Sequence, residues 1–318
     1  MFERMIYRRL GKTGLEVSLL SLGSGGARRL GQAIGFELKE QKALVRHAMA
    51  LGVNLIDTAE DYGESEAILG ECLRGIPRDQ YMLSTKWIAR EGDAFISDPQ
   101  ALLTSVEGSL KRLNTDYVDV MFFHGPLPSE YDQLVDCLYP AMERLKEAGK
   151  IRYVGLSTRF VKDPAQEVAR LALAQHPELW DVLMLKYGIL NQFAAKTIFP
   201  MVAKHDVGIM NMAAVRIKLP DPELLRATIL DWKIKNLVAV NALPEHDPLG
   251  WLVHDDVLSV IEAGYRFAAE PKLISTVISG TSSIAHLDAN ARSLERPGLS
   301  ESDSRQLKEL FGEIIEYA

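Results

Sequence analysis

The sequence predicts an α/β fold in which eight parallel strands, each followed by a helix, close into a (β/α)8 TIM barrel. Short apolar runs rich in β-branched residues alternate along the chain with longer helical patterns. Eight such runs occur, which is the number of βα units that closes a parallel sheet into a barrel. No GxGxxG motif follows the first run, so a doubly wound dinucleotide-binding sheet ranks second.

Each expected strand is a short apolar run that ends in turn residues or polar groups. The expected strands cover residues 18–23, 54–57, 81–86, 118–124, 153–157, 182–185, 208–212 and 275–279. The expected helices cover about 40–51, 65–74, 99–113, 139–149, 164–175, 196–206, 256–269 and 283–293. Strand and helix therefore alternate from one end of the chain to the other.

Three segments fall outside this repeat. "YRRLGKTGLEV" reads as an N-terminal β-hairpin with turns at Gly11 and Gly14, placed to close the bottom of the barrel. An extra C-terminal helix is expected over 301–315, with Ser300 as its cap and Asp303 three residues on. Residues 213–255 read as one long irregular stretch, and loops of that length in a compact domain are usually functional.

Composition excludes several classes of protein. The 318 residues are 47% hydrophobic and 25% charged, and no linker divides them, so one domain over 1–318 is expected. A net charge of −7 argues against a nucleic-acid partner. Cys72 and Cys137 lack the spacing of a disulfide framework or a metal site. Without a signal peptide or an apolar run long enough to span a membrane, a cytoplasmic protein with no membrane partner is expected.

Polar side chains stand at the ends of three neighbouring strands of the predicted barrel. Asp57 ends the second strand, Lys86 the third and His124 the fourth, and Tyr62 follows shortly after Asp57. Barrel enzymes place their catalytic groups at the carboxyl ends of the strands, so these side chains are expected at one mouth. Taken singly, each has a structural explanation: a helix cap, a solvent-reaching lysine, a core histidine or a rim aromatic. The set of four favours a catalytic site.

These side chains suit proton transfer to a carbonyl oxygen. A tyrosine, whose ordinary pKa is about 10, needs a nearby cation to favour its phenolate, and Lys86 supplies one. Asp57 keeps that lysine charged, while His124 orients the carbonyl oxygen. A glycosidase would need a second carboxylate, for which Glu60 and Asp61 in the same loop remain candidates. Side chains cannot donate a hydride, so carbonyl reduction implies a nicotinamide cofactor.

These motifs resemble those of the aldo-keto reductase family over nearly the whole chain. "RRLGKTGLEVSLLSLGSGG" is similar to the family's opening, "GVNLIDTAEDYGESEAILG" to its Asp/Tyr motif, "LSTKW" to its lysine strand and "DYVDVMFFHGP" to its histidine strand. The resemblance assigns Asp57, Tyr62, Lys86 and His124 to the catalytic tetrad, with Tyr62 as general acid/base. It implies an NAD(P)(H)-dependent oxidoreductase that acts on an aldehyde, ketone, sugar or alcohol.

The resemblance further implies a nicotinamide cofactor that lies extended across the barrel mouth. The matching cofactor positions are Gly23, Ser24, Asp57, Ser157, Thr158, Met184, Met212, Arg216, Gly280, Thr281, Ser282, His286 and Asn290. Thr158 replaces the usual Asn, Met184 the usual Gln, and Met212 the aromatic residue that stacks on nicotinamide. Arg216 is expected to bind the pyrophosphate.

Selectivity between the two nicotinamide cofactors is left open by the same resemblance. Gly280 and His286 stand where strongly NADPH-selective members carry Lys and Arg, and Ala289 stands where a Glu is usual. Backbone N–H groups at the start of the helix after Ser282 can still bind a phosphate. NADP(H) is therefore expected from the family, with NAD(H) as the alternative.

The sequence also offers a candidate for the substrate pocket and a second class of function. Trp87, beside the lysine, is expected to form a wall of the pocket, although packing alone explains it nearly as well. A second class of function is a cofactor-binding regulatory or redox-sensing subunit with the same barrel. The intact tetrad favours the enzyme, whose residues serve either direction of the reaction, and no pattern in the sequence sets the oligomeric state.

Overall fold

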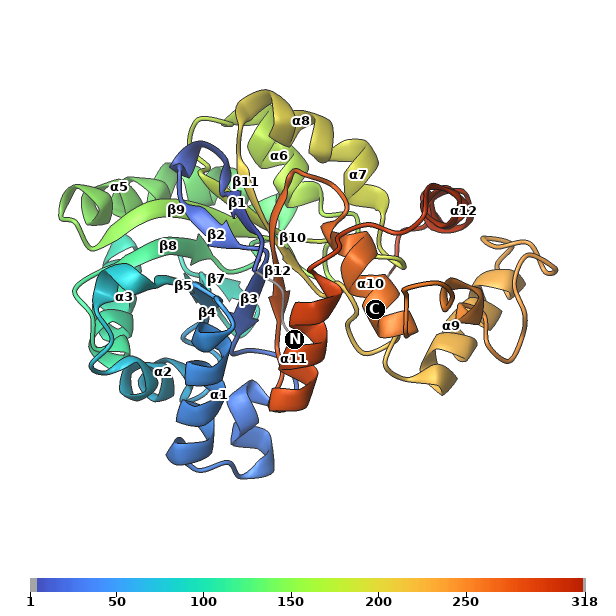
Figure 1. Cartoon of the computed structure of the whole chain (residues 1–318). Coiled ribbons are helices and arrows are strands. Elements are labelled where there is room, and N and C mark those ends of the chain that lie inside the picture. The colour runs from blue at the N-terminus through green and yellow to red at the C-terminus, as the bar shows by residue number, and fades with distance from the viewer. Residues whose placement is uncertain (1–4, 317–318) are drawn as a thin grey trace.

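The computed structural model describes residues 5–316, and its centre is a closed barrel of parallel strands (Figure 1). The strands are β3 (Leu20–Gly23), β4 (Leu55–Asp57), β5 (Met82–Trp87), β8 (Val118–Phe123), β9 (Ile151–Ser157), β10 (Val182–Lys186), β11 (Gly208–Met212) and β12 (Ile274–Ser279). Their order around the barrel follows the chain, and β12 pairs with β3 to close it. The predicted eight-stranded barrel is confirmed.

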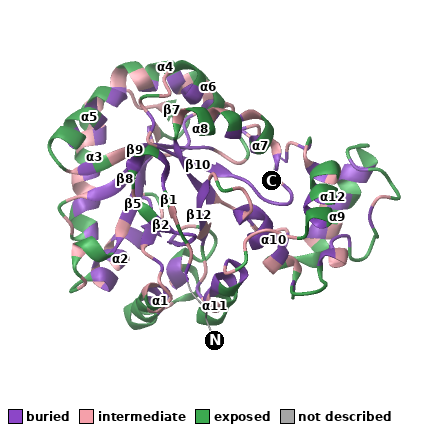
Figure 2. Ribbon diagram, turned by 45° about the horizontal axis from the view of Figure 1, so that its top comes forward, coloured by how far each residue is buried: buried purple, intermediate pink, exposed green. Residues whose placement is uncertain are grey.

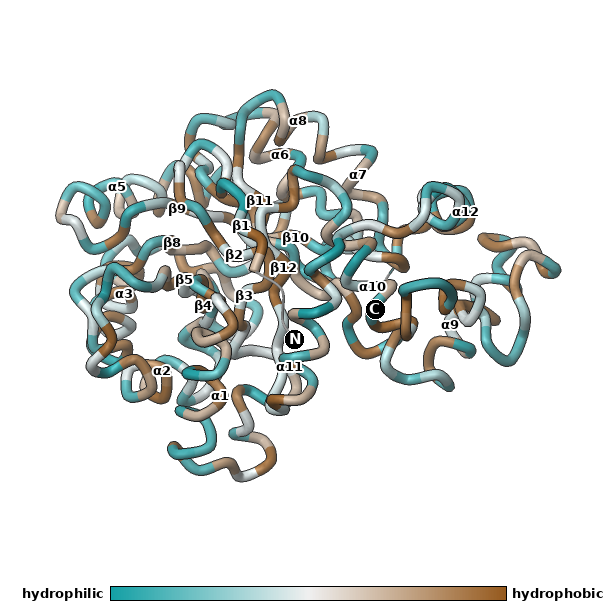
Figure 3. Tube along the Cα trace, in the orientation of Figure 1, coloured by the Kyte–Doolittle hydropathy of each residue, from teal (hydrophilic) through white to brown (hydrophobic). Residues whose placement is uncertain are grey.

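Helices cover the outside of the barrel (Figure 1). They are α1 (Leu38–Ala50), α2 (Ser65–Leu73), α3 (Pro99–Leu113), α4 (Tyr131–Gln133), α5 (Tyr139–Glu147), α6 (Glu167–Gln175), α7 (Phe193–Thr197), α8 (Phe199–His205), α10 (Val260–Ala269) and α11 (Ile284–Ser293). Figure 2 shows the strands buried and the outer sides of the helices exposed, and Figure 3 shows the matching change from hydrophobic to hydrophilic residues. No helix within residues 5–316 is both long and apolar enough to cross a membrane.

Alternation along each strand produces two separate apolar cores. In β8, Val120 and Phe122 belong to a cluster inside the barrel, whereas Met121 and Phe123 belong to the larger cluster between strands and helices. Successive side chains of a strand point to opposite faces, which explains the division. The inner cluster fills the lower barrel and leaves the carboxyl ends of the strands for polar groups.

The predicted N-terminal hairpin is present and closes the bottom of the barrel. β1 (Tyr7–Arg9) pairs antiparallel with β2 (Glu16–Ser18), and a short 3-10 helix (Gly11–Thr13) joins them. Leu10 and Val17 from this hairpin belong to the cluster inside the barrel. A Cβ on Gly208, at the start of β11, would lie 2.8 Å from Cγ of Leu10. The close approach of hairpin and strand therefore depends on that glycine.

The C-terminal helix is also confirmed, with its predicted cap. α12 covers Glu301–Phe311, and the Ser300 hydroxyl accepts a hydrogen bond from the Asp303 N–H at 3.1 Å. This bond satisfies one of the free N–H groups that every helix start leaves.

Residues 213–255 contain a helix that the sequence reading missed. α9 (Pro222–Ile234) begins after Asp221, whose side chain accepts from the Leu224 N–H at 3.0 Å. The prolines of this stretch suggested irregular structure, but proline is well suited to the first position of a helix. Trp232 of α9 packs against Phe311 of α12 with 5.6 Å between ring centroids, and both helices lie to one side of the barrel (Figure 1).

Two smaller differences concern helix starts and a hairpin. The helix expected from residue 256 begins at Val260, where the Ser259 side chain caps it. The helix expected over 196–206 is divided into α7 and α8. A short antiparallel pair, β6 (Arg90–Glu91) with β7 (Ala94–Phe95), follows β5 and was not expected.

Truncation of the hairpin's buried leucine tests whether the hairpin stabilises the barrel. The Leu10 side chain is 0% exposed, so we expect Leu10→Ala to lower the free energy of unfolding by about 2–5 kcal/mol through lost burial and a residual cavity. Urea denaturation measures this loss. Leu258→Ala, at a side chain that is 79% exposed, is the control and should change stability by less than about 0.5 kcal/mol. Equal effects of the two substitutions would contradict a stabilising role of the hairpin.

Candidate active site

A buried ion pair lies at the carboxyl end of the barrel. Nζ of Lys86 donates to Oδ2 of Asp57 at 2.6 Å and to the Thr58 carbonyl oxygen at 2.6 Å. The other carboxylate oxygen of Asp57 accepts from the Ser84 hydroxyl at 2.7 Å. Burial works to lower the pKa of Lys86, but Asp57 and Tyr62 together outweigh burial and the pKa is raised. The lysine, whose side chain is 1% exposed, therefore stays charged.

Tyr62 is held over this pair by a close backbone contact. The centroid of its ring lies 4.9 Å from Nζ of Lys86. On its other side, a Cβ on Gly25 would lie 2.5 Å from Cε2 of Tyr62, so the loop after β3 can approach the ring only because residue 25 is glycine. Tyr62 is thus fixed between a backbone segment and a buried cation.

The pKa of Tyr62 is raised, contrary to the simple expectation that the lysine favours the phenolate. Burial raises the pKa of the phenol; the positive charge of Lys86 lowers it, and the negative charges of Asp57 and Asp61 add to the increase. The expected effect of the lysine is present, but burial exceeds it. Tyr62 consequently keeps its proton at neutral pH, as a proton donor must.

His124 completes the group and is contacted by a carboxylate. Its ring centroid lies 5.7 Å from that of Tyr62 in an edge-on arrangement. Nδ1 of His124 lies 3.2 Å from Oδ1 of Asp61. Burial works to raise the pKa of Asp61, but the neighbouring His124 and Lys86 outweigh it and the pKa is lowered. Asp57, Tyr62, Lys86 and His124 therefore lie together.

Glu60, the other carboxylate of the loop, is directed elsewhere. It accepts a hydrogen bond from the Ser105 hydroxyl in α3, and Nη2 of Arg112 lies 3.8 Å from the same carboxylate oxygen. Burial raises its pKa. Because Glu60 is engaged with helix α3, it does not form a carboxylate pair with Asp57 across the mouth.

The expectation that Trp87 forms a pocket wall is wrong. Trp87 is 3% exposed and belongs to the apolar core between strands and helices. Since Lys86 points into the barrel, the next residue of β5 must point out of it. Ile88, one residue further on, lines a hollow beside His124 together with Ala89 and Phe123.

Four predicted cofactor residues lie on or just after β9, β10 and β11. Met184 lies in the core inside the barrel, with Met212 packed against it. The Ser157 hydroxyl accepts from the Gly125 N–H at 2.9 Å, and Thr158 donates to Oε1 of Gln166 at 3.0 Å. Both hydroxyls are thus bonded within the chain. Gln166, which the sequence did not indicate, links the ends of β9 and β10 through hydrogen bonds to Thr158 and to the Lys186 carbonyl oxygen.

Arg216 lies in a cationic cluster, defined here as Lys186, Arg216 and Lys218. Cζ of Arg216 stacks 3.6 Å from the centroid of the Phe160 ring. Burial and then the charge of Arg216 lower the pKa of Lys186 to about 8. One carboxylate, that of Glu316, pairs with Lys218, while the Glu316 carbonyl oxygen accepts from Lys186 at 2.9 Å. The charges of Asp163 and Asp231 also act on the two lysines, whereas Arg216 has no ion pair among the described residues and suits an anion.

Several polar groups of the segment after β12 form hydrogen bonds within the segment itself. The Thr281 hydroxyl accepts from the Ser283 N–H at 3.1 Å, and Ser283 caps α11 through the His286 N–H at 3.3 Å. His286 has an exposed side chain. Asn290 donates to the Ser279 hydroxyl at 2.9 Å and faces inward.

Two contacts join this segment to the loop after β3. Nη1 of Arg28 donates to the Ser282 hydroxyl at 3.5 Å. A Cβ on Gly280 would lie 3.3 Å from the Gly25 carbonyl oxygen. A guanidinium that the sequence reading missed therefore reaches the predicted phosphate segment.

Two unpartnered atoms fit the predicted dinucleotide. Ser24 Oγ and Arg216 Nη1 are buried and have no hydrogen-bond partner among the described residues, and both belong to the predicted cofactor set. Buried polar atoms ordinarily have partners, so a missing acceptor or donor indicates a ligand position. Gly23 adds a close approach, since its Cβ would lie 2.6 Å from Cγ2 of Ile278. In the part of the chain that the structure describes, no group of His, Cys, Asp and Glu side chains could hold a metal ion.

Comparison with known proteins identifies the family and agrees with the fold. The sequence profile of the aldo/keto reductase family matches residues 21–311. L-galactose dehydrogenase of Arabidopsis thaliana is 37% identical over 155 residues, which are 47% of each protein, so the match spans about half that relative's length. NADH-specific methylglyoxal reductase of Escherichia coli (strain K12) is 29% identical over 80% of this chain and 77% of that protein.

A solved structure shares the fold over nearly the full length. The holo form of the aldo-keto reductase AKR11C1 from Bacillus halodurans superposes with a TM-score of 0.74 and covers 99% of this chain and 98% of its own. The sequence identity is 24%, so the likeness describes the fold.

Removal of the buried cation tests how far Asp57 depends on Lys86. We expect Lys86→Met to lower the free energy of unfolding by about 3–5 kcal/mol, because it leaves a buried carboxylate without its cation. Lys86→Met combined with Asp57→Asn should recover part of the loss, since the uncompensated charge is then gone. Urea denaturation of the two single variants and the double variant measures the coupling; strictly additive losses would contradict it.

Proposed function

The chain belongs to the aldo/keto reductase family, and from this premise we propose that it interconverts a small carbonyl compound and its alcohol with NAD(P)(H). In the reducing direction, the carbonyl, NAD(P)H and a proton give the alcohol and NAD(P)+. A bound nicotinamide supplies the hydride that forms the new C–H bond. The chain itself supplies the proton, the orientation of the substrate and the binding of both molecules.

Tyr62 is the proposed proton donor to the carbonyl oxygen, and accepts the proton back in the oxidising direction. The observation that carries this role is the geometry around the phenol, with Lys86 paired to Asp57 on one side and His124 on the other. The nearby ammonium stabilises the phenolate that forms as the proton leaves. The raised pKa of Tyr62 keeps the donor protonated before reaction.

His124 is the proposed residue that orients the substrate oxygen. Its Nδ1 faces Asp61 at 3.2 Å, and Nε2 has no hydrogen-bond partner within residues 5–316. A ring whose one nitrogen faces a carboxylate presents the other to the pocket. The substrate oxygen then lies between Nε2 and the phenol of Tyr62.

The proposed cofactor lies across the mouth between the two groups of predicted residues. The unpartnered Arg216 Nη1 and the cationic cluster around it suit the pyrophosphate. Ser24 follows Gly23, which lies opposite Asp57 of the tetrad on the neighbouring strand. Ser157 and Thr158 are the proposed contacts of the nicotinamide, and their hydroxyls are bonded to the Gly125 N–H and to Gln166.

NADP(H) is the proposed cofactor, with NAD(H) as the alternative. Arg28, which bonds to Ser282, supplies the guanidinium that Gly280 and His286 do not. The alternative has support in the E. coli relative, whose name specifies NADH. The two relatives are named for a sugar dehydrogenase and a reductase of methylglyoxal, so a small, polar, oxygen-rich substrate is proposed.

Loss of the phenol tests the reaction. We expect Tyr62→Phe to lower kcat for carbonyl reduction by about 10²–10⁴-fold, because general acid catalysis contributes that much, and to leave cofactor binding within a few-fold. NADPH fluorescence titration and an aldehyde panel measure the two quantities. Tyr7→Phe, which removes a hydroxyl bonded to Gly52 in the hairpin region, is the control. Unchanged turnover in Tyr62→Phe would remove the proposed acid; cofactor binding with no turnover in the wild type would indicate the regulatory subunit instead.

The proposed cofactor preference rests on Arg28. A hydrogen bond to a charged group contributes about 1.5–3 kcal/mol, so Arg28→Gln should weaken NADPH binding about tenfold or more and change NADH binding little. Fluorescence titration gives both dissociation constants. Arg29→Gln, in the same loop and with the same change of charge, is the control. Equal wild-type affinity for NADH and NADPH would favour the alternative.

A further inference from the structure

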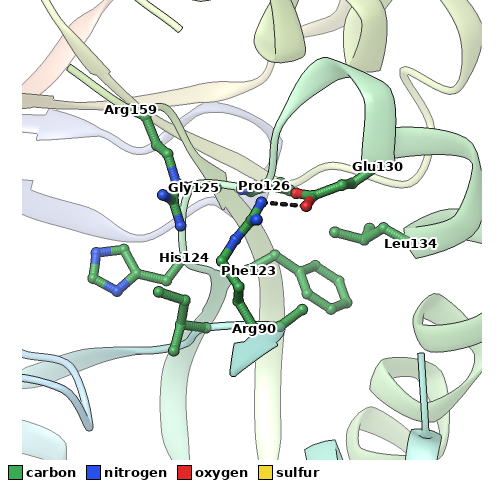
Figure 4. A pocket seen from close by; sticks show the side chains of 10 residues that line it. Arg90, Phe123, His124, Gly125, Pro126, Glu130, Leu134 and Arg159 are labelled. Atoms are coloured by element: carbon green, nitrogen blue, oxygen red, sulfur yellow. Dashed lines mark hydrogen bonds and ion pairs between the residues drawn. The ribbon is translucent and has the colours of Figure 1, made fainter. Parts of the chain in front are cut away.

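A hollow beside His124 contains two arginines that differ in their surroundings. It is lined by His124, Arg90, Arg159, Gly125 and Glu130, with apolar side chains at its walls (Figure 4). Figure 4 shows Arg159 on the side of His124 and Arg90 directed toward Glu130. Because the rings of His124 and Tyr62 contact each other edge-on, this hollow adjoins the proposed position of the carbonyl.

Arg90 is neutralised within the chain. Its Nη2 pairs with Oε1 of Glu130, and both side chains are largely buried. The second carboxylate oxygen of Glu130 accepts from the Leu127 N–H at 2.7 Å. The charge of Arg90 therefore already has its partner, and this pair shapes the hollow without attracting an anion.

Arg159 has no carboxylate of its own. Its Nε donates to the Gly125 carbonyl oxygen, and among the described residues its two Nη groups have neither an ion pair nor a hydrogen bond. Burial, and then the charge of Arg90, lower its pKa, which describes a guanidinium short of a counterion. The carboxylates of Glu130, which is paired with Arg90, and of Asp61, which faces His124, offset this effect in part.

Gly125 determines where the Arg159 side chain lies. This glycine has φ +60, and a Cβ there would lie 2.6 Å from Cγ of Arg159. Its N–H is fixed on Ser157 and its carbonyl oxygen on Arg159, so one residue anchors the guanidinium to the barrel end. Arg159 is therefore held against the strand ends rather than extended into solvent.

We propose that Arg159 binds a carboxylate group of the substrate, so that the carbonyl compound turned over here is an aldehyde or ketone acid. The proposal rests on the proposed function, because it assigns the substrate class of the same site. With Nε engaged, the two Nη groups remain as a planar pair of donors, which matches the two oxygens of a carboxylate. His124 then contacts the carbonyl oxygen at the other end of the molecule.

Binding of matched acids and esters tests the proposal without requiring turnover. The probes are 3- and 4-formylbenzoate and their methyl esters, which carry the aldehyde at two distances from the charge. Calorimetric titration, with and without NADP+, should give at least tenfold tighter binding of the better acid than of its ester in the wild type. Arg159→Gln should abolish that difference, and Arg159→Lys should keep part of it, since it retains the charge without the planar donors.

The matched control is Arg170→Gln, which removes an exposed arginine paired with Glu167 on α6. It should retain the preference for the acid. Equal wild-type binding of acid and ester, or a preference that survives in Arg159→Gln, would overturn the proposal. Tighter binding of 4-formylbenzenesulfonate than of 4-formylbenzoate would also overturn it, because the site would then suit a tetrahedral anion.

Turnover separates the failure of this proposal from the failure of the proposed function. If the aldehydes are reduced but the ratio of kcat/KM for acid over ester is the same in the wild type and in Arg159→Gln, the reaction stands and the carboxylate site falls. If acid binding depends on Arg159 and no aldehyde is reduced, the carboxylate site stands and the reaction falls.

Discussion

The buried pair of Lys86 and Asp57 is the interaction on which the rest of the mouth depends. A charge of either sign at this depth is costly alone, and the two together are tolerable only because each has further partners, Thr58 for the ammonium and Ser84 for the carboxylate. The pair fixes the ends of β4 and β5 side by side and gives Tyr62 a cation to lie against. The atoms whose burial is costly for stability are therefore the same atoms that the proposed chemistry uses.

Most of the barrel could be predicted from the chain because its signals are local and repeated. Eight apolar runs that alternate with helical patterns are sufficient to count strands, and Ser300 with Asp303 predicted the last helix start correctly. α9 was missed because prolines around its first residues look like loop signals until the cap at Asp221 is considered. The short pair β6 and β7 carries no apolar pattern that a sequence reading could use.

The site was predictable in its centre and less so at its edges. Asp57, Lys86 and His124 stand at strand ends, where position along the chain determines position in space. Trp87 was misplaced because adjacency to the lysine was given more weight than the alternation of a strand. Arg28, Gln166 and Arg159 were missed because each reaches the mouth from a loop, and only the folded structure shows which loops meet.

The alternation of Lys86 and Trp87 in β5 also has a consequence for folding fidelity. A slip of β5 by one residue would turn the ammonium into the apolar layer beneath the helices and the indole into the polar mouth. Both exchanges are unfavourable. The first separates the ammonium of Lys86 from Asp57, and the second leaves the carboxylate of Asp57 beside a large apolar ring. Lys86, which supports the proposed proton transfer, thus also discriminates against misregistered barrels, so that selection for activity and selection for correct strand pairing act on the same lysine.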